Sequence, residues 1–191
     1  MATFEEQGDG DSRGATARRP AGAPLFLVGF MASGKSTVGR LVAARLGWEF
    51  RDLDRVIAEA AGRPIPEIFA AEGEEGFRRR EAEAVAAAAE LRHAVIATGG
   101  GAACREPNLS RMLAAGHVVA LAVSPEEVVR RTQGRSNRPL LDGAADPLAA
   151  ATALLQARQP FYARAHATIQ TQGLQPDEVA AAVMRVLEAD R

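Results

Sequence analysis

The apolar residues of this chain are grouped in two ways that alternate along the sequence. Short apolar runs of strand-favouring residues predict strands at 24–28, 48–51, 93–97, 117–123 and 167–170. Between them, apolar residues recur at helical spacing and predict helices at 36–46, 53–61, 74–92, 108–115, 147–164 and 176–188, with shorter ones from 64 and from 124. Because strands alternate with helices, we expect an α/β fold with about five parallel strands and helices on both faces of the sheet.

Two stretches lack this periodicity. Residues 1–23 are rich in Gly, Ala, Arg and charged side chains, which predicts a disordered N-terminal tail. Residues 132–146 contain Gly134, Pro139 and Gly143 together with several arginines, which predicts a loop. With 191 residues in all, the chain is long enough for one domain with a substantial core, and we place that domain at 24–191.

Residues 29–37 match the phosphate-loop pattern, in which a glycine and four further residues precede Gly-Lys-Ser. They lie between a predicted strand and a predicted helix, which is the context that the motif requires. Backbone N–H groups of such a loop form a concave anion site, and the helix N-terminus adds partial positive charge. Lys35 can reach the β- and γ-phosphates, and the Ser36 hydroxyl can ligate Mg²⁺. The motif therefore indicates binding of a nucleoside triphosphate with Mg²⁺.

Two carboxylates, those of Asp52 and Asp54, follow the second predicted strand. Ligands of open α/β sheets gather at this edge of the sheet. We expect the two groups to have different tasks, one toward the metal and phosphates and the other toward an acceptor substrate. The alternative for Asp52 is that it only caps the helix that follows, where acids lie beside the positive end of the helix dipole.

Arginines and glycines at three further places suggest ligand contacts. Arg78 precedes Glu81 by one helical turn, so Glu81 can hold its guanidinium in a fixed orientation. Arg138 lies in the glycine-punctuated loop, where a cation near a triphosphate would stabilise charge during transfer. The three glycines at 99–101 allow close backbone approach to a ligand, although a tight strand-to-helix turn is the alternative. Composition does not say which arginine faces phosphate and which faces substrate.

Overall composition narrows the classes of partner. A formal net charge of −1 and 5% aromatic residues argue against a nucleic-acid binder. No apolar run approaches the roughly 18 residues of a membrane span, and the acidic N-terminal residues argue against a secretory signal. The single cysteine, Cys104, cannot form an intramolecular disulfide, which favours a reducing compartment. We therefore expect a cytoplasmic protein that binds neither nucleic acid nor membrane.

Taken together, six motifs make the chain resemble the shikimate kinase family from about residue 25 to residue 187. They are Gly-Phe-Met-Ala-Ser-Gly-Lys-Ser-Thr-Val-Gly-Arg at 29–40, Asp-Leu-Asp at 52–54, Phe-Arg-Arg-Arg-Glu at 77–81, Gly-Gly-Gly at 99–101, Arg-Pro-Leu-Leu at 138–141 and Arg-Gln-Pro-Phe-Tyr at 158–162. The resemblance implies a P-loop NTPase of the nucleoside monophosphate kinase-like type, with a five-stranded parallel sheet in the order 2-3-1-4-5. It further implies a substrate-binding region at about 54–92 and a lid at about 132–146.

The same resemblance implies an activity. The chain would transfer the γ-phosphate of ATP to the 3-hydroxyl of shikimate, giving shikimate 3-phosphate and ADP on the route to chorismate and the aromatic amino acids. Its small-molecule partners would be ATP and shikimate, its cofactor Mg²⁺, and its expected oligomeric state a monomer.

The resemblance also implies a role for each matching residue. ATP would be bound by Ala32, Ser33, Gly34, Lys35, Ser36, Thr37, Arg131 and Arg138, with Arg131 against the adenine. Mg²⁺ would be held by Ser36 and Asp52. Shikimate would be bound by Asp54, Arg78, Gly99, Gly100, Gly101 and Arg158, with the two arginines on its carboxylate. Lys35, Asp54 and Arg138 would be the catalytic groups.

One position departs from the family pattern, because Ala32 stands where members commonly have glycine. If the loop needs a positive φ there, alanine would be strained by about 1 kcal/mol. Two other functions remain open. One is another small-molecule kinase of the same fold, such as a gluconate or nucleotide kinase, and the other is a nucleotide-dependent regulator without turnover. Arg78 and Arg158 together with Asp54 favour a hydroxylated carboxylate as acceptor.

Overall fold

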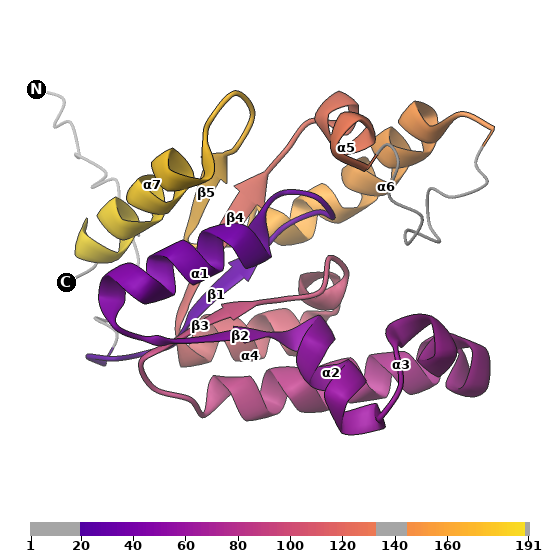
Figure 1. Ribbon diagram of the computed structural model, residues 1–191, viewed down its shortest axis with the longest axis horizontal. Helices are drawn as coiled ribbons and strands as arrows, with labels where there is room; N and C mark the ends of the chain where they lie inside the picture. The colour runs from indigo at the N-terminus through magenta and orange to yellow at the C-terminus, as the bar shows by residue number, and fades with distance from the viewer. Residues whose placement is uncertain (1–19, 133–144, 190–191) are drawn as a thin grey trace, which may run out of the picture.

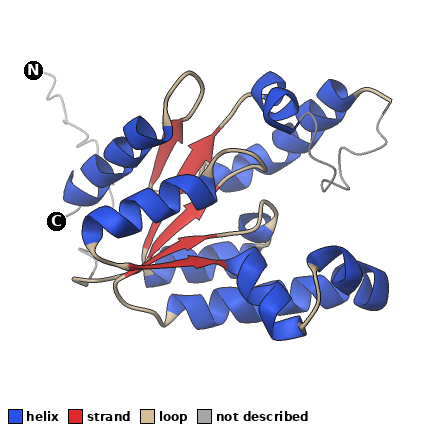
Figure 2. Ribbon diagram, viewed as in Figure 1, coloured by secondary structure: helices blue, strands red, loops and turns tan. Residues whose placement is uncertain are grey.

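The computed structural model describes residues 20–132 and 145–189, which contain a five-stranded sheet with helices on both faces (Figures 1 and 2). The strands are β1 (Leu25–Val28), β2 (Glu49–Asp52), β3 (Ala94–Ala97), β4 (His117–Ala122) and β5 (Ala167–Gln170). They are ordered β2-β3-β1-β4-β5, and each adjacent pair is parallel. The predicted fold class and strand order are therefore confirmed.

Two layers of helices explain why the central strands are apolar throughout. The helices are α1 (Lys35–Leu46), α2 (Leu53–Ala61), α3 (Ile65–Ala89), α4 (Glu106–Ala115), α5 (Pro125–Thr132), α6 (Pro147–Tyr162) and α7 (Pro176–Ala189), with a short 3₁₀ turn η1 (Ala102–Cys104). Leu25 and Leu27 of β1 pack with α1 and α7, whereas Phe26 and Val28 pack in the opposite cluster with residues of α3, α4 and α6. A strand buried on both faces needs an uninterrupted apolar run rather than an alternating one.

Helices α2 and α3 extend beyond the β2 edge of the sheet (Figure 1). They have a small core of their own, formed by Ile57, Ile68 and Phe77. The sequence predicted two helices between 64 and 92, and α3 is indeed broken at Gly73, where φ is 69° and ψ is −175°. The second part of α3 presents Arg78 and Glu81 toward the sheet side, so the kink positions a region of the candidate site.

Residues 20–23, which the sequence assigned to the tail, form a turn at the amino end of β1. Ala23 is buried, and its N–H donates to the Pro20 carbonyl oxygen at 3.0 Å. The carbonyl oxygen of Gly22 accepts from the His93 N–H at 2.8 Å. Packed chain therefore begins before residue 24. The rest of the expected tail (1–19) and most of the expected lid (133–144) lie outside the described residues.

The parallel arrangement of β1, β2 and β3 determines where the candidate site lies. Their carboxyl ends lead directly into the phosphate loop, the Asp52–Asp54 segment and the glycines at 99–101. Parallel strands present their carboxyl ends at one edge of a sheet, so three motifs that are far apart in the sequence meet there.

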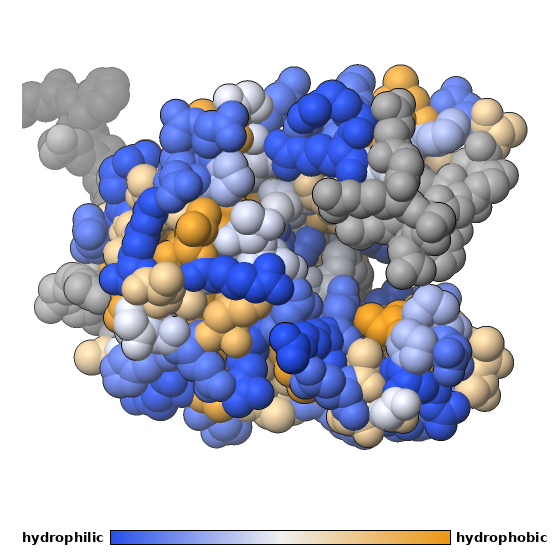
Figure 3. All heavy atoms as spheres, in the orientation of Figure 1, coloured by the Kyte–Doolittle hydropathy of each residue, from blue (hydrophilic) through white to orange (hydrophobic). Residues whose placement is uncertain are grey.

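On the face drawn in Figure 3, hydrophilic residues predominate and hydrophobic residues are scattered among them. Within residues 20–132 and 145–189, the structure has no helix of the length and apolarity that crossing a membrane requires.

Candidate active site

The loop between β1 and α1 forms one wall of the site. Gly29 has a φ of 135°, and a Cβ there would overlap the Leu121 carbonyl oxygen, so this position requires glycine. Gly34, with a φ of 95°, caps α1, which begins at Lys35. The Lys35 Nζ donates to the carbonyl oxygens of Gly29 (2.9 Å) and Phe30 (2.8 Å). The lysine side chain therefore folds back across the loop that the sequence assigned to phosphate binding.

Ala32 has a φ of 58°, in the left-handed region that favours glycine. The loop therefore does need a positive φ at this position, and the alanine is strained by about 1 kcal/mol. Its carbonyl oxygen accepts from the Arg131 Nη1 at 3.0 Å. This contact ties α5 to the loop at its strained residue.

Asp52 caps α2 and also contacts the start of α1. Its Oδ1 accepts from the Asp54 N–H at 3.2 Å, which is the geometry of a helix N-cap for α2. Its Oδ2 accepts from the Ser36 hydroxyl at 2.5 Å. A carboxylate and a hydroxyl oxygen therefore lie together beside the phosphate loop. Asp52 ends β2 whereas Asp54 lies in the first turn of α2, so the change from strand to helix gives the two carboxylates different directions.

A second cluster forms around the glycines that follow β3. A Cβ at Gly99 would lie 2.8 Å from the Asp54 Oδ1 and 3.0 Å from the Glu81 Oε1, so glycine is needed for these side chains to meet. The Arg78 Nη1 donates to the Glu81 Oε2 at 2.9 Å. A Cβ at Gly101 would lie 2.9 Å from the same Arg78 nitrogen. Asp54 and Arg78 thus both lie against the glycine turn, Asp54 at Gly99 and Arg78 at Gly101.

Glu81 holds Arg78 from a buried position. Its side chain is buried, and burial raises the pKa of Glu81 while the Arg78 guanidinium acts in the opposite direction. The nearby Asp54 carboxylate adds to the upward shift of that pKa. Removing Arg78 would therefore leave a buried carboxyl without its cation, which is costly in a low-dielectric environment.

Arg158 reaches the same turn from α6. Its Nη1 donates to the Gly100 carbonyl oxygen at 3.2 Å, and its Cζ lies 5.4 Å from the centroid of the Phe30 ring. A Cβ at Gly100 would lie 3.4 Å from the Met31 backbone nitrogen, so the glycine turn and the phosphate loop are close neighbours. Two guanidinium groups, from α3 and α6, therefore flank a turn that lies against the phosphate loop.

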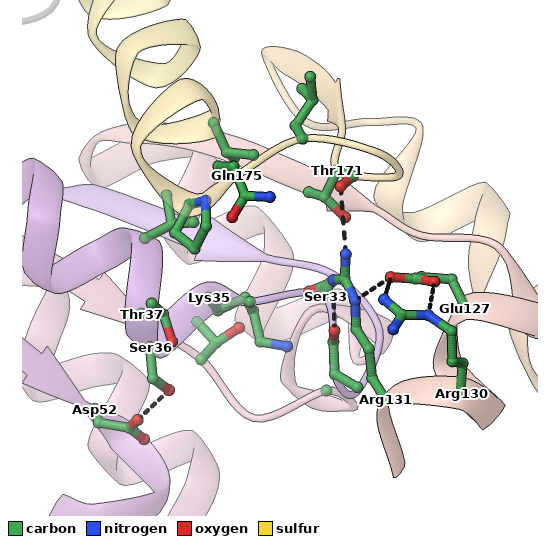
Figure 4. A pocket seen from close by; sticks show the side chains of 18 of the residues that line it. Ser33, Lys35, Ser36, Thr37, Asp52, Glu127, Arg130, Arg131, Thr171 and Gln175 are labelled. Carbon is green, nitrogen blue, oxygen red and sulfur yellow. Dashed lines mark hydrogen bonds and ion pairs between the residues drawn. The ribbon is translucent and has the colours of Figure 1, made fainter. Parts of the chain in front are cut away.

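A cavity of about 600 Å³ opens over the phosphate loop (Figure 4). Arg131 lies at one side of it, where its Nε donates to the Glu127 Oε1 at 2.6 Å and its Nη2 to the Thr171 carbonyl oxygen at 3.3 Å. Hydrogen bonding to Arg130 is the main reason why the pKa of Glu127 falls to about 2, so Glu127 is ionised at neutral pH. The cavity lining includes the predicted residues Ala32, Ser33, Gly34, Lys35, Ser36, Thr37, Asp52, Asp54, Gly100 and Arg131.

Part of this lining was not identified from the sequence. The segment between β5 and α7 contributes Thr171, Gly173, Leu174 and Gln175, and α7 contributes its first residue, Pro176. The segment carries no motif, although its place after a predicted strand was a signal that could have been used. Glu127 lies in the short helix that the sequence predicted from residue 124, but it was given no role in the site. Arg138, predicted as catalytic, lies outside the described residues.

Comparisons with known proteins agree with this geometry. The family model described as shikimate kinase matches residues 31–188. A shikimate kinase from Symbiobacterium thermophilum is 50% identical over 167 residues, covering 86% of this chain and 95% of the relative. A second one, from Moorella thermoacetica, is 47% identical over 165 residues, covering 86% of this chain and 94% of the relative. The chain belongs to the shikimate kinase family.

Solved structures separate this family from others of the same fold. The shikimate kinase from Acinetobacter baumannii, solved in complex with shikimate, superposes with a TM-score of 0.84 at 38% identity, covering 88% of this chain and 94% of that one. A gluconokinase from Sinorhizobium meliloti has a TM-score of 0.60 at 16% identity, covering 90% of this chain and 94% of that one, and shares the fold alone. The predicted family and enzyme class are confirmed, and the chain is a phosphotransferase that uses ATP.

Proposed function

We propose that this shikimate kinase transfers the ATP γ-phosphate to the 3-hydroxyl of shikimate through the residues gathered at the carboxyl edge of β1, β2 and β3. One observation carries the assignment of the site. Arg78, Arg158 and Asp54 come from three separate helices and converge on the glycine turn beside the phosphate loop. Two cations and a carboxylate around a small turn suit an acceptor that carries both a carboxylate and hydroxyls. The relative from Acinetobacter baumannii was solved with shikimate, which supports this choice of acceptor.

On the acceptor side, Arg78 and Arg158 bind the carboxylate of the substrate. A guanidinium pairs with a carboxylate through two parallel N–H donors, which an ammonium group cannot provide. Asp54 orients the attacking hydroxyl and accepts its proton during transfer. The N–H groups of Gly100 and Gly101 bind the substrate at close range because neither residue has a side chain in the way.

On the donor side, the N–H groups of the phosphate loop bind the phosphates and Lys35 neutralises their charge. In the structure Lys35 spans two loop carbonyls, so phosphate binding requires its amine to exchange those partners for phosphate oxygens. Arg131, which lines the same cavity, packs against the adenine in this proposal. Transfer passes through a loose transition state in which charge spreads over the transferred group, so positioning and charge stabilisation account for most of the catalysis. Arg138 and closure of the lid at 132–146 remain predictions from the sequence.

The oxygens of Ser36 and Asp52 fit a magnesium ion. Mg²⁺ prefers hard oxygen ligands and is usually bound by one or two protein groups together with phosphates and water. The Ser36 hydroxyl and the Asp52 carboxylate are 2.5 Å apart beside the loop. Within the described residues there is no cluster of three or more His, Cys, Asp or Glu, which is compatible with a site completed by phosphates. When bound, the ion supplies charge neutralisation on the phosphate oxygens.

An assay of ADP release with different acceptors tests the function directly. The full chain is incubated with ATP and Mg²⁺ together with shikimate, gluconate or a nucleoside monophosphate. We expect rapid ADP release with shikimate only. Turnover with gluconate or a nucleoside monophosphate instead would assign another kinase activity, and ATP binding without turnover of any acceptor would indicate a regulator. The cytoplasmic location and the monomeric state stay predictions from the sequence.

A further inference from the structure

The last residue of α6 contacts the glycine turn at the same atom as Arg158. The Tyr162 hydroxyl donates to the Gly100 carbonyl oxygen at 2.6 Å, and the Arg158 Nη1 donates to that oxygen at 3.2 Å. The two residues are four positions apart on one helix, so they approach the turn side by side. Burial raises the pKa of Tyr162 above its ordinary value, so the phenol remains protonated and can donate. Sequence reasoning included Tyr162 in a motif without giving it a task.

The Gly100 carbonyl controls the direction of a neighbouring N–H group. The carbonyl of Gly100 and the N–H of Gly101 belong to one peptide plane, and no described peptide bond is cis. In a trans peptide these two groups point in opposite directions. Between two glycines the plane would otherwise rotate easily, because neither residue has a Cβ to restrict φ and ψ. Fixing the carbonyl oxygen therefore fixes the orientation of the Gly101 N–H, one of the donors assigned to the substrate.

Substrate binding changes the partners of this carbonyl. When Arg158 turns to a substrate carboxylate, its weak 3.2 Å contact with the Gly100 oxygen is exchanged for a charge-assisted one. The Gly100 carbonyl is partly buried, so losing this donor without a replacement is unfavourable. The shorter Tyr162 bond does not involve the substrate, so it can keep the carbonyl paired throughout.

We propose that Tyr162 is a positioning residue that holds the Gly100–Gly101 peptide in the orientation that binds the acceptor. The proposal rests on the proposed function, because it takes Arg158 and the glycine turn as the acceptor site. This positioning role differs from that of a buried aromatic ring that only packs against its neighbours. A packing residue would affect both substrates through stability, whereas a residue that orients this peptide affects the acceptor alone.

The variant Tyr162→Phe tests this role, since it keeps the ring and removes only the hydroxyl. One hydrogen bond contributes about 0.5–1.5 kcal/mol, so we expect the KM for shikimate to rise about three- to tenfold. The KM for ATP should stay within about twofold, because the phosphate loop does not depend on this bond. The matched control is Thr152→Val, which removes another hydroxyl of α6 that donates to the Leu148 carbonyl oxygen at 2.7 Å on the exposed side. It should change neither KM.

Three results of this experiment would test the role of Tyr162 and the proposed function separately. A rise confined to the shikimate KM in Tyr162→Phe, with thermal unfolding close to that of the wild type, supports the role of Tyr162. An unchanged shikimate KM, or equal rises in both KM values, would overturn it. The wild type is assayed in the same series. Failure of the wild type to use shikimate would overturn the proposed function, which is a different result from overturning the role of Tyr162.

Discussion

The two halves of the site are built on different principles. The half that we assign to the nucleotide is centred on a continuous segment, residues 29–37, whose shape comes from backbone conformation at Gly29, Ala32 and Gly34. The acceptor half is assembled from Asp54, Arg78, the glycines at 99–101 and Arg158, which the fold brings together from α2, α3, the end of β3 and α6. A contiguous motif can occur in many folds. A pocket made from separate segments exists only where the fold packs those segments together. Changes in the two halves should therefore have separable effects.

The largest effect is expected at the nucleotide half. Lys35→Ala removes the amine that we propose neutralises the phosphates, and loss of one such electrostatic group typically lowers kcat by about 10²–10³-fold. Circular dichroism should show an intact fold, because the loop conformation rests mainly on its glycines. Arg40→Ala is the matched control, since this cation of the same helix contacts the Ser36 carbonyl oxygen on the exposed side. Near-normal turnover of Lys35→Ala would contradict the role of the lysine.

The next effect is expected at the acceptor half. Arg78→Ala removes a guanidinium that we propose pairs with the substrate carboxylate, so the KM for shikimate should rise about 10- to 100-fold while the KM for ATP changes little. It also leaves Glu81 buried without its cation, so the melting temperature should fall. Arg80→Ala is the matched control, because Arg80 pairs with Glu72 on the same helix at 2.8 Å, away from the glycine turn. Equal rises in both KM values of Arg78→Ala would refute the separation between the halves.

The smallest effect concerns the strained residue of the loop. Ala32→Gly relieves about 1 kcal/mol of left-handed strain but costs about 0.5–1 kcal/mol of backbone entropy. The net change should lie between zero and a stabilisation of about 0.5 kcal/mol, measured by denaturant unfolding. Ala44→Gly, at an exposed position of α1, should instead destabilise by about 1 kcal/mol. The same sign for both variants would show that the φ of Ala32 carries no strain.

The sequence predicted the nucleotide half better than the acceptor half for a physical reason. Glycines with required positive φ leave a contiguous pattern, and the strand and helix around them follow from apolar periodicity. The sequence likewise predicted a short helix from 64 and a longer one at 74–92, which agrees with the break of α3 at Gly73. Arg158, in contrast, was placed through the family resemblance, because nothing in its neighbours indicates that α6 folds back over the glycine turn.

The sequence analysis missed residues whose contacts join distant parts of the chain. Thr171 and Gln175 line the cavity only because β5 is the edge strand beside β4. Tyr162 meets Gly100 across 62 positions of sequence, a contact that no local pattern records. Asp52 was left with two alternatives, and the structure shows that the cap and the contact with Ser36 use different oxygens of one carboxylate.

The placement of Lys35 has a practical consequence. It is the only lysine among the 191 residues, every other basic side chain apart from the histidines being an arginine. Among these residues, Lys35 is therefore the single side-chain target of an amine-selective reagent. Because Lys35 lines the cavity that we assign to the nucleotide, we expect bound nucleotide to protect it from labelling.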